Sequence, residues 1–170
     1  MRLDRRDLEG CFAREHEGDE PRLIVDMPAH APVAEAYRTV RNSIAYATVD
    51  HPPHSLAVTS GIPEEGKSTV AMNLAISMAR DGRRVVVIDA DFRRPAQHRF
   101  FPDTGNHVGV TNVLLGEVRL EEALQALPIP GLQLLASGPL PGDPGALVES
   151  LKMRQLLLDV GRQCDVVVVH

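Results

Sequence analysis

The feature that most constrains the fold is the segment 61–69, which matches the phosphate-loop pattern G-x-x-x-x-G-K-[ST]. An apolar stretch at 55–60 precedes it and predicts a buried strand, and apolar residues spaced three or four apart over 67–80 predict a helix after it. Backbone N–H groups between a strand and a helix N-terminus can bind phosphate, so we expect a nucleotide site here. The residues expected to bind the nucleotide are Gly61, Pro63, Glu64, Glu65, Gly66, Lys67, Ser68 and Thr69.

Two side chains of this loop have expected roles in binding ATP and Mg²⁺. The Lys67 ammonium would neutralise charge on the β- and γ-phosphates, and the Ser68 hydroxyl would bind Mg²⁺. The alternative is a chance match at an ordinary turn between a strand and a helix. The strand pattern before the loop and the helix pattern after it argue against that alternative.

The rest of the chain alternates between strand and helix patterns. Strands are expected at 84–89, 132–136 and 165–170, and helices from Val33 to before His51 and at 111–115, 120–127 and 147–163. This order predicts an α/β fold, a three-layer, phosphate-loop NTPase-like sheet of mainly parallel strands flanked by helices. We expect it to be incomplete on the C-terminal side, because no helix or strand follows the valine-rich segment 166–169.

Composition narrows the domain organisation and the partners. A chain of 170 residues with 44% hydrophobic content supports one core, so we expect a polar leader at 1–31 and a partial nucleotide-binding domain at 32–170. The net charge of −5 argues against nucleic acid as a partner. The two cysteines lie far apart without a secretory signal, which indicates the cytoplasm. No apolar stretch reaches the roughly 20 residues that cross a bilayer, so membrane association would require a partner.

Two carboxylates follow the strand expected at 84–89. Asp89 and Asp91 come at the carboxyl end of that strand, where parallel sheets bind ligands. Phosphoryl transfer needs acidic groups to hold Mg²⁺ or its waters and to orient the attacking oxygen. We expect Asp89 to orient the nucleophile and Asp91 to bind the metal, although the two roles can be exchanged. The alternative is that both aspartates only terminate the strand.

Three motifs, together with the phosphate loop, resemble the cytoplasmic kinase domain of bacterial tyrosine kinases, the family that governs capsule and exopolysaccharide synthesis. The resemblance runs from about Glu35 to the C-terminus. The phosphate loop is followed by a D-x-D-x-R motif, and the segment 137–144 is similar to the family's proline-rich loop. Within this resemblance Lys67, Asp89 and Asp91 are the expected catalytic residues.

The third motif is E-x-x-R-x-x-R in the first expected helix. In the family this helix joins subunits into a ring in which they phosphorylate one another. At helical spacing the three charged side chains would form one strip beside the apolar positions Tyr37, Val40, Ile44 and Ala47. The alternative is an intrahelical ion pair worth about 0.2–0.5 kcal/mol with no role in assembly. The expected oligomerisation residues are Glu35, Arg38 and Arg41.

The chain departs from the family in two respects. The family's third acidic motif is an apolar strand that ends in Asp, whereas here the strand is followed by His170. Imidazole suits Mg²⁺ poorly, because this ion prefers oxygen ligands. The segments that follow this strand in the family, including its tyrosine cluster, have no counterpart, and the only tyrosines are Tyr37 and Tyr46.

The resemblance implies an ATP-binding, autophosphorylating tyrosine kinase domain that works with a membrane-embedded polysaccharide co-polymerase. A second interpretation is an inactive, truncated remnant that serves as an interaction module. A third is a partitioning or septum-positioning ATPase, which is disfavoured because Ile62 stands where those enzymes have a second lysine.

Overall fold

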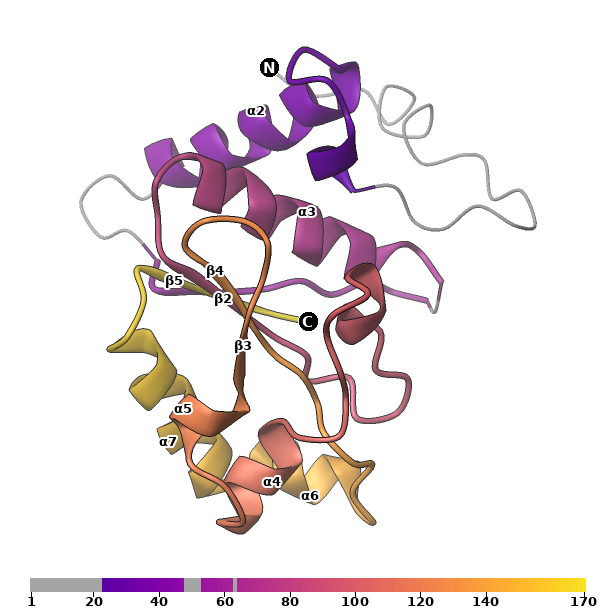
Figure 1. Cartoon of the computed structure of the whole chain (residues 1–170), viewed down its shortest axis with the longest axis vertical. Coiled ribbons are helices and arrows are strands. Elements are labelled where there is room, and N and C mark those ends of the chain that lie inside the picture. Colours follow the sequence, from indigo (N-terminus) through magenta and orange to yellow (C-terminus); the bar gives the residue numbers. More distant parts are fainter. Residues whose placement is uncertain (1–22, 48–52, 63) are drawn as a thin grey trace.

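The computed structural model describes residues 23–47, 53–62 and 64–170. Its core is a sheet of five strands in the order β1-β5-β2-β4-β3, with helices on both faces (Figure 1). The strands are β1 (Ser55–Ala57), β2 (Val85–Ile88), β3 (Leu124–Ala126), β4 (Leu132–Leu135) and β5 (Val166–Val169). The helices are α2 (Pro32–Ala47), α3 (Lys67–Arg80), α4 (Val110–Leu115), α5 (Leu120–Ala123), α6 (Pro144–Glu149) and α7 (Leu151–Gly161), with 3-10 turns η1 (Ile24–Asp26) and η2 (Gln97–Phe100).

The sheet is parallel except at one edge. β5 lies between β1 and β2 and is parallel to both, and β2 is parallel to β4. Only β3 runs antiparallel, along β4. The expected α/β class with a mainly parallel sheet is therefore confirmed, and the valine-rich strand β5 has a neighbour on each side, as its composition indicates.

Successive residues of the strands point to the two opposite faces of the sheet, so each strand contributes to two apolar cores. Val85 and Val87 of β2 pack under α3 with α2 outside it, and Val86 packs against the helices of the other face. Figure 1 shows α2 and α3 on one side of the sheet and α4, α6 and α7 on the other. Helix layers on both faces of the sheet make the three expected layers.

Helix α3 is the most enclosed helix of the fold. All of its residues from Ala71 to Ala79 are buried, because the sheet covers one side and α2 and η1 cover the other. Its buried Asn73 accepts a hydrogen bond from the Ile24 backbone N–H at 2.8 Å. Leu23 and Ile24 are themselves only 3% and 2% exposed. The end of the expected leader thus packs onto α3, whereas residues 1–22 lie outside the described part of the chain.

Two expected helices differ from the structure. The segment expected to be helical at 120–127 stops at Ala123 and continues as the edge strand β3, whose pairing with β4 outweighs its local helical pattern. The helix expected at 147–163 is two helices, because Ser150 adopts an extended conformation and its hydroxyl accepts a hydrogen bond from the Met153 N–H at 3.0 Å. Ser150 is thus the N-cap of α7.

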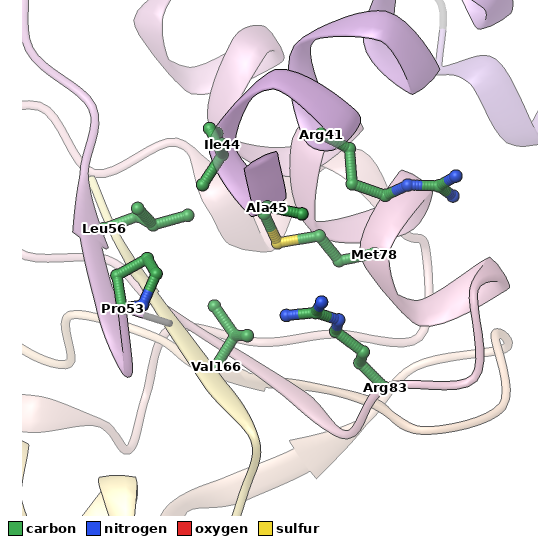
Figure 2. Close-up of a pocket in the computed structure, with 8 residues that line it drawn as sticks. All are labelled: Arg41, Ile44, Ala45, Pro53, Leu56, Met78, Arg83 and Val166. Atoms are coloured by element: carbon green, nitrogen blue, oxygen red, sulfur yellow. The ribbon is translucent and has the colours of Figure 1, made fainter. Parts of the chain in front are cut away.

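A hollow lies between α2 and the amino-terminal ends of β1 and β5 (Figure 2). The phosphate loop lies at the opposite, carboxyl ends of these strands. Apolar side chains, among them Leu56 and Val166, form part of the wall of the hollow, and Figure 2 shows the Arg83 guanidinium pointing toward Val166 and the Arg41 guanidinium pointing away. Its full lining is Arg41, Ile44, Ala45, Pro53, Leu56, Met78, Arg83 and Val166. Within the described ranges, no helix combines the length and apolar character needed to cross a membrane.

Candidate functional site

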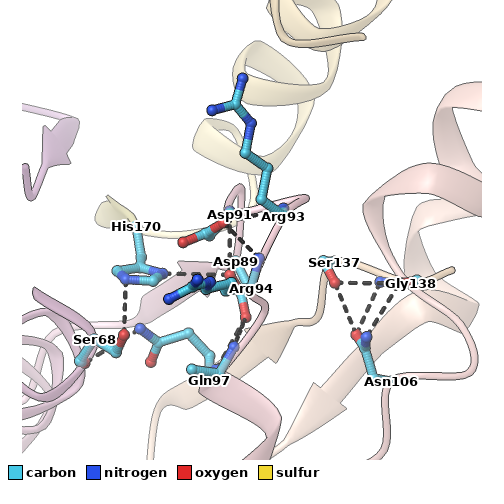
Figure 3. Close-up of polar contacts among 11 residues, drawn as sticks. Ser68, Asp89, Asp91, Arg93, Arg94, Gln97, Asn106, Ser137, Gly138 and His170 are labelled. Atoms are coloured by element: carbon cyan, nitrogen blue, oxygen red, sulfur yellow. Dashed lines mark hydrogen bonds and ion pairs between the residues drawn. The ribbon is translucent and has the colours of Figure 1, made fainter. Parts of the chain in front are cut away.

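The strand order brings three distant segments to one edge of the sheet. The phosphate loop follows β1, Asp89 follows β2 and His170 follows β5. Because these three strands are parallel, their carboxyl ends meet at the same edge, where α/β folds bind ligands. β5 lies between β1 and β2, so His170 lies between the phosphate loop and Asp89. Figure 3 shows this arrangement.

Two residues of the phosphate loop adopt a backbone conformation that favours anion binding. Gly66, just before α3, has φ +80°, and Glu64 has φ +66°, so both adopt the left-handed conformation. Alternation of this kind turns successive N–H groups toward one point. The loop is held from within, because the Ser60 hydroxyl donates to the Ile62 carbonyl at 2.8 Å and the Ile62 N–H donates to the Glu65 carboxylate at 3.3 Å.

The loop residues predicted to bind the nucleotide divide into two groups. Gly61, Glu64 and Glu65 are exposed at the tip, and Pro63 lies outside the described residues. Lys67, Ser68 and Thr69 form the half-buried first turn of α3. The positive end of a helix dipole, four unpaired N–H groups and a lysine therefore meet in one place, as binding of a phosphate chain requires.

Asp89 is fully buried and holds the loop that follows β2. One carboxylate oxygen accepts hydrogen bonds from the Ala96 and Gln97 N–H groups, each at 2.9 Å, and the other accepts from the Asp91 N–H at 3.2 Å. The carboxylate is 0% exposed. Asp89 therefore bends residues 90–97 back over the edge of the sheet, which is a structural role that the sequence motifs do not indicate.

Asp91 is placed differently. One of its carboxylate oxygens accepts hydrogen bonds from the backbone N–H groups of Arg93 at 3.0 Å and Arg94 at 2.8 Å. Its other oxygen has no hydrogen-bond partner among the described residues, and the side chain is partly exposed. Of the two aspartates, Asp91 is thus the one that a ligand or a solvated ion can reach.

His170 joins the phosphate loop to Asp89. Its Nε2 lies 2.9 Å from the Ser68 hydroxyl oxygen, and its Nδ1 lies 3.3 Å from a carboxylate oxygen of Asp89 (Figure 3). We call this chain of contacts, Ser68 to His170 to Asp89, the histidine bridge. The side chains of His170 and Asp89 are only 1% and 0% exposed, so this half of the bridge is closed to solvent.

Ser68 and Asp89 cannot hold one Mg²⁺ together in the arrangement described. Ser68 and Asp89 are two of the three expected metal ligands, with Asp91, yet the His170 ring separates their oxygens. No group of three or more His, Cys, Asp or Glu side chains in the described part of the chain could hold a metal ion. Ser68 and Asp91 keep oxygen atoms of the kind that Mg²⁺ prefers, so these two remain predictions for the metal site.

The three residues expected to mediate assembly do not form one strip. Glu35 and Arg38 make an exposed ion pair at 3.0 Å, as the alternative interpretation requires. Arg41 instead turns onto α3, where it donates to the Ser77 carbonyl at 3.1 Å and contacts the Asp81 carboxylate at 3.3 Å. Its side chain is only 15% exposed. Of the expected apolar positions, Tyr37 and Ile44 face the core, but Val40 and Ala47 are exposed.

The spacing of residues along α2 indicates why Arg41 differs from Glu35 and Arg38. Ala34, Tyr37, Arg41 and Ile44 follow one another at steps of three or four, so Arg41 belongs to the stripe that faces α3. The long apolar part of an arginine side chain can cross such a surface while its guanidinium reaches polar groups beyond it.

Gln97 is a site residue that no sequence motif indicates. Its side-chain amide donates to the Ser68 backbone carbonyl at 3.2 Å, and its own N–H donates to Asp89. It is 0% exposed, and its side-chain oxygen has no hydrogen-bond partner in the described structure. Gln97 therefore connects the phosphate-loop helix to the loop after β2. A single glutamine outside any motif gives no sequence signal for such a role.

A second polar cluster closes the neighbouring end of β4. The Asn106 amide oxygen accepts hydrogen bonds from the Ser137 hydroxyl and the Gly138 N–H, each at 3.0 Å. Gly138 has φ +79°, and a side chain at Gly109 would come within 2.0 Å of the Ala136 carbonyl oxygen. Close backbone packing accounts for both glycines. Figure 3 shows this cluster apart from the histidine bridge.

Comparison with known families gives a match over most of the described fold. Residues 56–163 match the sequence profile of the family described as the CobQ/CobB/MinD/ParA nucleotide binding domain. The tyrosine-protein kinase YwqD of Bacillus subtilis (strain 168) is 43% identical over 136 residues, which are 79% of this chain and 56% of that kinase. This chain thus spans little more than half the length of that relative.

Solved structures agree with the sequence comparisons. The crystal structure of the chimerical protein CapA2B2 superposes with a TM-score of 0.84 at 30% identity, covering 98% of this chain and 74% of that one. The kinase domain of the Escherichia coli tyrosine kinase ETK superposes with a TM-score of 0.80 at 32% identity, covering 92% and 61%. The expected phosphate-loop NTPase-like fold is confirmed by these structures.

Proposed function

We propose that this chain, which belongs to the CobQ/CobB/MinD/ParA nucleotide binding domain family, is the ATP-binding part of a protein-tyrosine kinase. Its relatives are bacterial tyrosine-protein kinases, among them YwqD and ETK. These relatives favour a kinase over a partitioning ATPase. The observation that carries the proposal is the phosphate loop, whose left-handed Gly66 leads directly into α3 with Lys67 in the first helical turn.

The proposed reaction transfers the γ-phosphoryl group of ATP to a tyrosine hydroxyl. The bond from the γ-phosphorus to the bridging oxygen of ADP breaks, a bond from the phosphorus to the tyrosine oxygen forms, and the hydroxyl proton passes to a carboxylate. Lys67 and the N–H groups of the loop stabilise charge on the phosphates. Asp91, with one accessible oxygen, suits the proton acceptor better than Asp89, whose oxygens hold backbone N–H groups.

Mg²⁺ is the ion we propose for catalysis. It would supply charge neutralisation on the β- and γ-phosphates, and Ser68 and Asp91 are the side chains placed to hold it or its waters. In this assignment Asp89 supports catalysis by holding the loop that carries Asp91. Its contacts from Asp91, Ala96 and Gln97 support that division of roles.

We further propose that the chain works in capsule or exopolysaccharide synthesis, in the cytoplasm and beside a membrane-embedded co-polymerase. The resemblance of its motifs to the bacterial tyrosine kinases supports this context. Ring assembly would use the exposed pair Glu35 and Arg38, whereas Arg41 is engaged with α3 in the same chain. The competing proposal is an inactive interaction module, and His170 at the position of the family's Asp favours it.

Calorimetric titration with ATP tests the proposed function. Lys67→Ala should abolish binding, because the lysine ammonium neutralises phosphate charge that the loop alone cannot. Lys152→Ala is the matched control, since Lys152 is the chain's only other lysine and donates to the Leu114 carbonyl at 2.8 Å, far from the loop. Equal ATP affinity in the two variants would refute the assignment of the site, and no binding by the unmodified chain would favour the interaction module.

A further inference from the structure

We propose that His170 sets how strongly the nucleotide site binds Mg²⁺, because the histidine bridge must break before the Ser68 hydroxyl can turn to an ion, whether that ion is shared with Asp91 or with Asp89. This inference rests on the proposed binding of nucleotide at the phosphate loop. It concerns the affinity for the metal alone, and it assigns His170 a role that is separate from phosphate recognition. Four observations carry it: the strand order, the two contacts of the ring, its burial and the hydrogen bonds that fix its backbone.

The geometry of the ring keeps the two oxygens apart. Each ligand oxygen of Mg²⁺ lies about 2.1 Å from the ion, so two ligands of one ion are at most about 4.2 Å apart. The Ser68 oxygen lies 2.9 Å from Nε2 and the Asp89 oxygen lies 3.3 Å from Nδ1, on opposite sides of the imidazole. With the ring between them, these oxygens are too far apart to share an ion.

Both ring nitrogens of His170 have a protein partner. Nδ1 lies at hydrogen-bond distance from the Asp89 carboxylate. Nε2 lies at hydrogen-bond distance from the Ser68 hydroxyl, which can donate or accept. Both ring nitrogens are therefore occupied by protein groups, and His170 offers no lone pair to a metal while the bridge is intact.

The backbone fixes the ring in this place. The His170 N–H donates to the Ile88 carbonyl at 3.0 Å, and the His170 carbonyl accepts from the Ala90 N–H at 2.8 Å. These two bonds continue the pairing of β5 with β2, so His170 is held as part of the sheet. The side chain is 1% exposed, and its partner Asp89 is 0% exposed, so water does not compete for that contact. Metal binding by the Ser68 hydroxyl therefore requires the ring to rotate away, and that rotation breaks both side-chain contacts.

Nucleotide recognition is separate from this bridge. The phosphate-binding groups are the N–H groups of the loop and Lys67, and none of them contacts His170 in the described structure. Removal of the imidazole should therefore leave metal-free nucleotide affinity nearly unchanged. It should increase the extent to which Mg²⁺ strengthens ATP binding, because the contacts of His170 with Ser68 and Asp89 no longer oppose metal binding. Each such hydrogen bond can change an equilibrium constant several-fold.

The test compares the dissociation constant of ATP in EDTA with that in Mg²⁺, measured by calorimetry. For the unmodified chain we expect the two constants to agree within about 3-fold. We define the ratio as the dissociation constant in EDTA divided by that in Mg²⁺. For His170→Ala we expect this ratio to rise roughly 10-fold, with the dissociation constant in EDTA unchanged. His170→Asp should give a larger ratio, because a second carboxylate beside Asp89 is repelled by it until a cation binds. His107→Asp, in an exposed loop, is the matched control and should keep the original ratio.

Each outcome decides the inference. A ratio near 1 for the unmodified chain that rises in both His170 variants supports it. A ratio of roughly 10 or more already in the unmodified chain, or an unchanged ratio in both variants, overturns it while leaving the nucleotide site intact. If the unmodified chain binds ATP in neither buffer, the proposed function fails as well. Circular dichroism of each variant establishes that it is folded, and if a variant is unfolded, the ratio measured for the unmodified chain alone decides the inference.

Discussion

Replacing Asp89 by alanine should destabilise the protein far more than the same change at Asp91. The Asp89 carboxylate is 0% exposed and accepts N–H groups from Ala96 and Gln97 at 2.9 Å and from Asp91 at 3.2 Å. Alanine would leave these donors without an acceptor in a buried place. The Asp91 carboxylate accepts two N–H groups as well, but its partners Arg93 and Arg94 are exposed and water can replace it.

The hydrogen bonds set the expected magnitude. A hydrogen bond to a charged group contributes about 1.5–3 kcal/mol, so losing the two 2.9 Å bonds of Asp89 should lower the free energy of unfolding by about 3 kcal/mol or more. Asp89→Asn keeps one carbonyl oxygen as an acceptor and should cost about half as much. Asp91→Ala should cost less than about 1 kcal/mol.

Equilibrium unfolding in urea, followed by circular dichroism, measures these differences. For a slope of about 1–3 kcal/mol per molar urea, a loss of about 3 kcal/mol moves the midpoint by about 1–3 M. From most to least stable, the order should be the unmodified chain, Asp91→Ala, Asp89→Asn and Asp89→Ala. If Asp89→Ala unfolds within about 1 kcal/mol of the unmodified chain, Asp89 does not hold the loop, and the division of roles between the two aspartates is wrong.

Two further predictions concern assembly and pH. Arg38→Glu should lower the particle mass in light scattering if Glu35 and Arg38 join subunits, whereas the same change at Arg154, an exposed residue of α7, should not. Equal masses for the two variants would remove this surface from the proposal. The Arg84 side chain and backbone N–H lower the pKa of Asp165 from 3.8 to about 2, so the stability from this pair is present above pH 3.8 and lost as the pH falls toward 2. The unfolding free energy of Asp165→Asn should thus approach that of the unmodified chain over this range, and a constant difference would contradict the assignment.

The local patterns of the sequence predict most elements of the fold. The helix predicted at 67–80 has the same bounds in α3, and all four expected strands form within a few residues of their predicted limits. These elements have long apolar runs or a clear helical period, so their local signal agrees with their final packing. Ser150 shows where such a signal misleads, because the apolar period continues across it while its hydroxyl begins a new helix.

The site is harder to predict than the fold. The phosphate loop and the two aspartates follow from their motifs, but the distances between them depend on strand order. No local pattern indicates that β5 separates β1 from β2. The contacts of His170 with Ser68 and Asp89, and the contact of Gln97 with Ser68, arise only from that order and from the loop after β2. The charge of Arg41 suggests an exposed position, whereas its place in the helical period puts it against α3.

The place of β5 in the sheet also determines when the nucleotide site can form. Ser55 of β1 pairs with Val167 of β5, which in turn lies beside Val86 of β2, so strands adjacent in space are far apart in the sequence. Pairing of this kind closes long loops and slows folding. During synthesis the phosphate loop emerges from the ribosome about 100 residues before β5. The positions of Ser68 and Asp89 relative to each other are not fixed until β5 pairs with both β1 and β2. Nucleotide cannot guide the early steps of folding, and its binding reports that β5 is in place.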